Sequence, residues 1–139
     1  MVPKRAPPKE KSNLPMNAIK KLWPKPKNLI EYGADFYKRV GKQLVQFEIL
    51  TELDKESFTT LCVAYHVLMT ASDGIFEHGS VVKGSKDEIK KNPSFTNFKM
   101  AADIYHRLSK RFYLCPADRE GVNIQKPIKR DNGKEKYFE

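Results

Sequence analysis

Residues 61–71, LCVAYHVLMTA, would place apolar side chains on nearly every side of a helix. Leu61 and Tyr65 fall on one helical face, whereas Val63 and Val67 lie off that face. A helix that is apolar all round has to be covered on more than one side. Because a chain of 139 residues supplies few other helices, we expect self-association to complete the cover. The residues expected to contact a neighbouring copy are Val63, Val67 and Ala71.

Helical spacing continues on the N-terminal side of this segment. An apolar stripe that begins at Leu29 and includes Gly33 predicts a first helix, with Asn28 as its N-cap. Gly33 is either a tolerated fault in that helix or the point where another helix approaches closely, and we favour close approach. Thr51 and Asp54 resemble a capping box, which predicts that the second helix starts there and runs to about residue 78.

The remaining chain predicts a connector and two more helical pieces. Turn residues flanked by short β-prone pieces between Gly79 and Pro93 indicate a small hairpin or ordered loop. Ser94 can cap a third helix, and Cys115-Pro116 reads as a helix stop followed by a short helical turn. The predicted fold is therefore all-α, with three main helices, a short C-terminal turn and a possible hairpin.

The positive charge is concentrated at the ends of the chain. Residues 1–27 carry eight basic groups and one acidic group, whereas residues 28–125 carry thirteen of each. Residues 1–27 also hold six of the nine prolines, so we expect a mostly disordered basic arm, with Trp23 docked on the body or on a neighbour. Residues 28–125 then form the helical core, and 126–139 a flexible tail.

A neutral body with a cationic extension is typical of a module that binds a polyanion, and nucleic acid is the leading partner. The alternative is a solubilising tail without a ligand, in which case the DNA surface would begin with Lys38, Arg39 and Lys42 on the first helix. The residues expected to bind DNA are Lys4, Arg5, Lys9, Lys11, Lys20, Lys21, Lys25 and Lys27.

Enzymatic chemistry finds little support in the sequence. Cys62 and His66 have the spacing of half a metal site, but no second pair completes it. Asp73 and Glu77 stand near a helix end, where carboxylates are usually only solvated. No glycine-rich phosphate loop occurs. We expect no enzyme activity, metal or cofactor. Two cysteines and the lack of a long apolar run indicate a cytoplasmic protein outside the membrane.

One short motif carries a family resemblance. An aromatic-rich helix end followed by Leu-x-Pro-x-x-Arg (Leu114, Pro116 and Arg119) resembles the C-terminal signature of the small subunits of phage terminases from cohesive-end tailed phages. Other features agree in order over residues 24–122, including a Pro-x-x-Leu start, Leu-Thr-x-x-Asp before the second helix and an Asn-Pro pair before the third. Cys115 departs from the pattern, because relatives commonly carry Thr or Ser before the proline.

The resemblance implies a non-catalytic, ring-forming protein in the cytoplasm of an infected bacterium. It implies that the ring recognises the packaging start on concatemeric double-stranded viral DNA and regulates a large subunit that carries the ATPase and nuclease. Arg119 is either a functional contact or an arginine lying over Tyr113. Two other functions stay open: a dimeric DNA-binding transcriptional regulator, and an adaptor whose tail has no ligand. The mass in solution distinguishes these functions.

Overall fold

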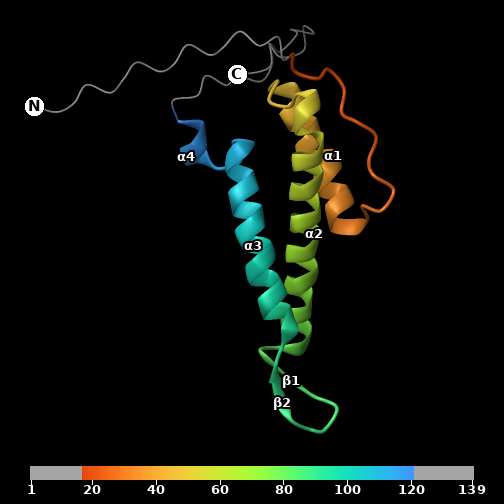
Figure 1. Ribbon diagram of the computed structural model, residues 1–139, viewed down its shortest axis with the longest axis vertical. Coiled ribbons are helices and arrows are strands. Elements are labelled where there is room, and N and C mark those ends of the chain that lie inside the picture. Colours follow the sequence, from red (N-terminus) through yellow and green to blue (C-terminus); the bar gives the residue numbers. More distant parts are fainter. Residues whose placement is uncertain (1–16, 121–139) are drawn as a thin grey trace, which may run out of the picture.

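A long antiparallel pair of helices forms the body of the protein. The structure, a computed structural model, describes residues 17–120. Helices α2 (Lys55–His78) and α3 (Pro93–Arg111) lie side by side, and α1 (Glu31–Gln46) packs against α2 (Figure 1). The expected fold of three main helices is confirmed.

A two-stranded hairpin connects α2 to α3, as expected. Strand β1 (Val81–Lys83) pairs antiparallel with β2 (Ile89–Lys91), and the hairpin extends beyond the end of the helix pair (Figure 1). Its register places Val81 opposite Lys91 and Lys83 opposite Ile89. The strands project from the body, and most of their side chains are exposed.

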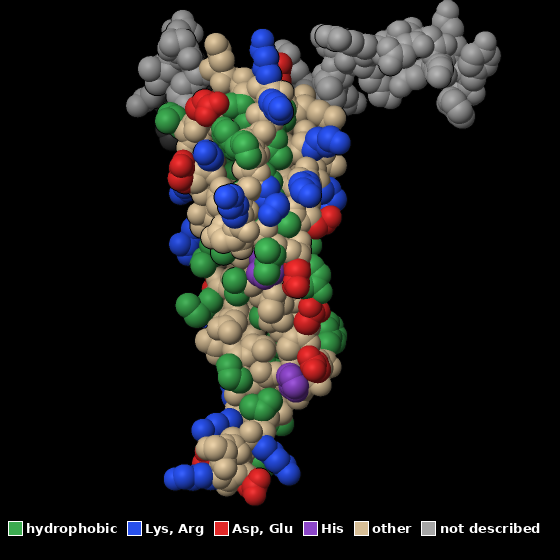
Figure 2. Space-filling model, turned by 90° about the vertical axis from the view of Figure 1, so that its right-hand side faces the viewer, with side chains coloured by type: hydrophobic (Ala, Val, Ile, Leu, Met, Phe, Trp, Pro, Cys, Tyr) green, Lys and Arg blue, Asp and Glu red, His purple; other side chains and the backbone are tan. Residues whose placement is uncertain are grey.

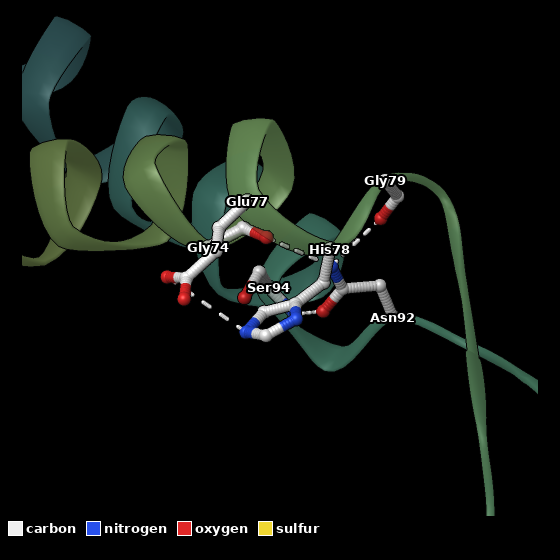
Figure 3. A network of polar contacts seen from close by, with 6 residues as sticks. All are labelled: Gly74, Glu77, His78, Gly79, Asn92 and Ser94. Carbon is white, nitrogen blue, oxygen red and sulfur yellow. Dashed lines mark hydrogen bonds and ion pairs between the residues drawn. The ribbon is translucent and has the colours of Figure 1, made fainter.

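The base of the hairpin is fastened to both long helices by Asn92, which is 3 % exposed. Its amide nitrogen donates to the carbonyl oxygens of Gly74 at 3.2 Å and Gly79 at 2.8 Å, and its side-chain oxygen accepts from the backbone N–H of Ser94 at 3.0 Å (Figure 3). Asn92 is therefore the N-cap of α3. The expectation that Ser94 caps this helix was wrong, because Ser94 supplies the N–H that Asn92 receives.

Helix α1 starts two residues later than expected, at Glu31, with Ile30 instead of Asn28 at the N-cap position. Asn28 lies in a turn before the helix and does not cap it. Instead, the backbone N–H of Gly33, in the first turn of α1, donates to Nδ1 of His66 on α2 at 3.2 Å. The cap comes from another helix because Ile30, at the N-cap position, has no side-chain acceptor.

The close approach expected at Gly33 is confirmed. A Cβ placed on Gly33 would lie 2.6 Å from Leu29 Cδ1 and 3.0 Å from His66 Cβ. The missing side chain therefore lets α1 rest directly on α2. The predicted capping box of Thr51 and Asp54 also forms, at the 3₁₀ turn η1 (Glu52–Asp54) that precedes α2. The Thr51 N–H donates to Asp54 Oδ2 at 2.8 Å.

Helix α3 ends before the proline by means of its own backbone. Tyr113 adopts a left-handed conformation with φ 58°, and the N–H of Leu114 donates to the carbonyl of Ser109. This is a Schellman-type ending. Pro116 then begins α4 (Pro116–Arg119), as expected, and Cys115 at its N-cap forms no side-chain bond. Helix α3 therefore ends before Pro116, and the proline only begins α4.

The core lies where α1, the first half of α2 and the end of α3 meet. Tyr37 and Phe58 are fully buried with ring centroids 5.2 Å apart, and Phe58 also meets Phe112 edge-on at 6.0 Å. Phe36 of α1 stacks on Tyr65 of α2 at 4.4 Å. These aromatic contacts tie the three helices together at one end of the molecule.

Residues 17–27 differ from the disordered arm that the sequence predicted. Ile19 is buried, and its N–H donates to the carbonyl of Leu50 at 2.9 Å. The expected docking of Trp23 occurs on its own chain, where its indole N–H donates to Glu52 at 3.1 Å and its carbonyl accepts from the Tyr37 hydroxyl. Apolar residues of this segment supply the anchorage that a count of prolines and lysines overlooks. Residues 1–16, and the tail at 126–139, lie outside the described residues.

Candidate nucleic-acid and subunit interfaces

Four lysines line one groove at the α1 end of the molecule. Lys20 and Lys21 come from the N-terminal segment, and Lys38 and Lys42 stand one helical turn apart on α1. All four side chains are exposed. The groove encloses about 500 Å³, and its other lining residues are Leu22, Val45 and Gln46. We call this feature the lysine groove. Four ammonium groups around one hollow create a positive potential that favours an anion.

The structure separates the remaining predicted cations from this groove. Arg39 pairs with Asp35 at 3.6 Å and lies 5.8 Å from the centre of the Phe36 ring. The Lys25 ammonium donates to the carbonyl of Leu29 at 2.6 Å, so this lysine closes the turn before α1. Lys27 is exposed. Four of the predicted DNA-binding residues lie outside the described part of the chain: Lys4, Arg5, Lys9 and Lys11.

Charge is unevenly distributed over the face that carries α1 and the N-terminal segment. Figure 2 shows lysine and arginine side chains gathered towards one end of this face and again at the opposite tip. Hydrophobic, acidic and histidine side chains occupy the part between them. The two positive regions are therefore at opposite ends of the molecule.

A second groove, between α2 and α3, is apolar. Val63 and Val67 of α2 are 44 % and 40 % exposed, and Met100 and Ile104 of α3 are 60 % and 41 % exposed. Together they line a hollow of about 280 Å³, with the small side chains of Ala64 and Ala101 buried beneath. We call this feature the apolar groove. Exposed aliphatic side chains gathered in one hollow are typical of a protein interaction surface.

The expected interface residues therefore divide into two kinds. Val63 and Val67 are accessible to a neighbour, whereas Ala71 is only 6 % exposed. Ala71 lies on the α3 side of α2, near the crossing where a Cβ on Gly74 would meet the Ser94 hydroxyl at 2.4 Å. Ala71 is therefore less accessible to a neighbouring copy than the two valines, because it lies beside Ser94 and Asn97 of its own chain.

Met100 and Ile104 were missed in the sequence. They follow the i, i+4 spacing of a helical face, which is the signal in the sequence that could have found them. In the structure the buried face of α3 includes Ala101 and Ser109. Small residues mark the contact because the two long helices lie close together.

Three of the side chains considered for catalysis or metal binding have contacts or burial that the structure defines: His66, Cys62 and Asp73. His66 Nδ1 accepts from Gly33, and burial raises the pKa of the Cys62 thiol to about 12. Asp73 accepts from the Tyr32 hydroxyl at 2.7 Å, and this bond raises the tyrosine pKa. Within residues 17–120, no cluster of three or more His, Cys, Asp or Glu side chains could hold a metal ion. None of the helices there is both long and apolar enough to cross a membrane.

The residues of the C-terminal motif lie on α4. Pro116 is its first residue and Arg119 its last, and both side chains are exposed. Leu114, just before this turn, packs against the core.

The described residues form a helical fold with a cationic groove between the N-terminal segment and α1 and an apolar groove between α2 and α3. The chain belongs to the phage terminase small subunit family, whose family model matches residues 33–128. The match includes α2, α3, the hairpin between them and all but the first two residues of α1. Searches of the curated proteins and of the solved structures gave no match.

Proposed function

We propose that the protein is the non-catalytic, DNA-binding small subunit of a viral DNA-packaging terminase. It recognises the packaging start on concatemeric double-stranded DNA and passes that DNA to the large subunit, which it regulates. It acts without a metal or cofactor in the cytoplasm of the infected bacterium. Membership of the terminase small subunit family over residues 33–128 is the observation that carries this proposal.

The lysine groove is the proposed site of first contact with DNA. Lys20, Lys21, Lys38 and Lys42 supply ammonium groups for backbone phosphates, and such contacts position DNA without reading its sequence. The basic residues before position 17 are close to Lys20 and Lys21 in the sequence. Arm and groove then act on neighbouring phosphates.

The apolar groove is the proposed contact between subunits. Val63 and Val67 bring exposed apolar surface from α2, and Met100 and Ile104 bring it from α3. A neighbouring copy that covers this groove through a different surface of its own makes a head-to-tail contact, which closes into a ring when the rotation between copies permits. A ring also brings several lysine grooves to one DNA molecule, which multiplies a modest affinity.

DNA affinity measured against salt concentration tests the proposal. Binding of a fluorescent duplex should weaken as salt rises, and Lys38→Gln combined with Lys42→Gln should reduce the slope of log affinity against log salt by about 1.8, at about 0.9 per phosphate contact. The control is Lys99→Gln with Lys110→Gln, which removes the same charge from exposed positions of α3.

Light scattering on the same samples gives the number of copies. A ring predicts a mass of many subunits, whereas a mass of two subunits would support the transcriptional regulator instead. Wild-type protein that fails to bind duplex DNA at low salt would refute the proposed function.

A further inference from the structure

The hairpin of β1 and β2 has two chemically different faces. Residues paired across antiparallel strands share a face, and successive residues alternate between faces. The register therefore puts Val81, Lys83, Ile89 and Lys91 on one face, and Val82 and Lys90 on the other. We call the first of these the outer lysine face.

Ion pairing separates the two faces further. Lys90 is neutralised by Glu88, with Nζ and Oε1 2.9 Å apart. No acidic group among residues 17–120 forms an ion pair with Lys83 or Lys91. The outer lysine face thus carries two exposed ammonium groups without a carboxylate partner in the described chain, while the opposite face is locally balanced.

The outer lysine face also exposes apolar surface. Val81 is 56 % exposed and Ile89 is 79 % exposed. A hairpin of two three-residue strands has little stability of its own, and here Asn92 holds its base. A firmly anchored ribbon that presents cations beside aliphatic groups is suited to a ligand with negative charges around less polar surface.

Duplex DNA matches these properties in charge and in shape. Its phosphates complement Lys83 and Lys91, and the major groove admits a two-stranded β-ribbon, where aliphatic side chains meet thymine methyl groups. We propose that the hairpin is a second DNA-contacting element, which inserts its outer lysine face into the major groove. This inference rests on the proposed DNA-binding function and adds a separate contact to it.

The distance between the two cationic regions supports a single duplex as the ligand of both. The lysine groove lies near the start of α2, since a Cβ on Gly41 would meet both Leu22 and Phe58. The hairpin follows the last residue of α2, His78. At 1.5 Å per residue, α2 separates them by roughly 30–36 Å, which is close to one turn of B-DNA.

Figure 2 shows lysine and arginine side chains towards both ends of this side of the molecule. The exposed carboxylates of Asp73 and Glu77 lie along α2 before the hairpin. They repel phosphates, so the duplex touches the two ends and stands away from the middle. A separation of one helical turn lets each end meet an equivalent groove on the same side of the DNA.

Matched lysine variants of the full chain test this inference on a duplex of about 24 base pairs, roughly two helical turns. Lys83→Gln with Lys91→Gln should reduce the salt slope by at least about 1.8 and weaken binding more than about tenfold at 0.1 M salt. Lys83→Arg with Lys91→Arg keeps the charge and should bind as wild type does. Ile89→Ala should weaken binding while leaving the salt slope unchanged.

Lys90→Gln is the control, because it removes one charge from the opposite, ion-paired face and should change the slope by less than either outer lysine. The inference is overturned if the outer-face double variant keeps wild-type affinity and slope, or if Lys90→Gln has an equal effect. It is also overturned if the double variant loses only the binding of added large subunit, which would make the hairpin a protein-docking element. In each of these cases a reduced slope in the Lys38 and Lys42 variant leaves the proposed function standing.

Discussion

Replacing His66 by leucine should loosen α1 from α2, because it removes the acceptor for the Gly33 N–H. The bond is 3.2 Å long, and Gly33 is buried, so water cannot readily replace the imidazole. A buried donor left without a partner costs about 1–3 kcal/mol, and a lost helix cap costs about 0.5–2 kcal/mol. These are two descriptions of the same bond, so we expect a loss of about 1–2 kcal/mol in the free energy of unfolding.

His66→Asn is the matched variant, because its side-chain oxygen stands close to the position of Nδ1 and can still accept. For a domain of this size, about 1 kcal/mol corresponds to roughly 4–8 °C in melting temperature. His66→Leu should therefore melt at least about 4 °C below His66→Asn in thermal unfolding followed by circular dichroism. Both proteins must be compared at one concentration, since association shifts the melting temperature. Equal melting temperatures, or a more stable leucine variant, would refute the reasoning that α1 is capped from α2.

Three further predictions follow from other contacts. Val67→Glu places a charge in the apolar groove at a position that is 40 % exposed, so light scattering should find smaller species with unchanged helix content, and a native mass would place the interface elsewhere. Glu48 has φ 56° just after α1, a conformation that glycine adopts without steric cost. Glu48→Gly should therefore raise the free energy of unfolding, measured in urea, by about 0.5–1 kcal/mol, whereas Glu48→Ala should give no such gain. Burial raises the pKa of Cys62 from 9.0 to about 12, so the stability that its protonated thiol contributes is complete below pH 9 and is lost as the pH rises towards 12. Between pH 8 and 10, the free energy of unfolding of the wild type should therefore fall by about 1.4 kcal/mol more than that of Cys62→Ala. Equal losses in the two proteins would contradict this prediction.

The helices could be predicted from the sequence because the spacing of their apolar residues shows directly which face is buried. The stripe through Phe36 and Val40 determines which face of α1 is buried, and Gly33 marks the close approach to α2. The ends of the helices were less predictable. Asn28 and Ser94 are both competent caps by local chemistry, but His66 and Asn92 supply the acceptors, one of them from another helix.

The candidate site was only partly predictable for a similar reason. Lysines in the N-terminal segment indicated a polyanion partner, but charge counting could not show that Lys20 and Lys21 meet Lys38 and Lys42 around one groove. That convergence depends on apolar residues of the segment, because Ile19 is buried and Leu22 and Trp23 pack against the core. Val63 and Val67 were predicted as exposed apolar residues because no arrangement of so few helices could cover every side of α2.

The hydrogen bonds of Asn92 at the base of the hairpin determine which part of the sequence can change in length. Its bonds to Gly74, Gly79 and Ser94, with the pairing of its own N–H to Ser80, close the chain at the base of the hairpin. Everything beyond that closure, residues 81–91, projects away from the helix pair. Insertions or deletions at the turn between β1 and β2 should therefore leave the spacing of α2 and α3 unchanged. The tip can therefore lengthen, shorten or exchange its charges while the helices that carry it keep the same packing.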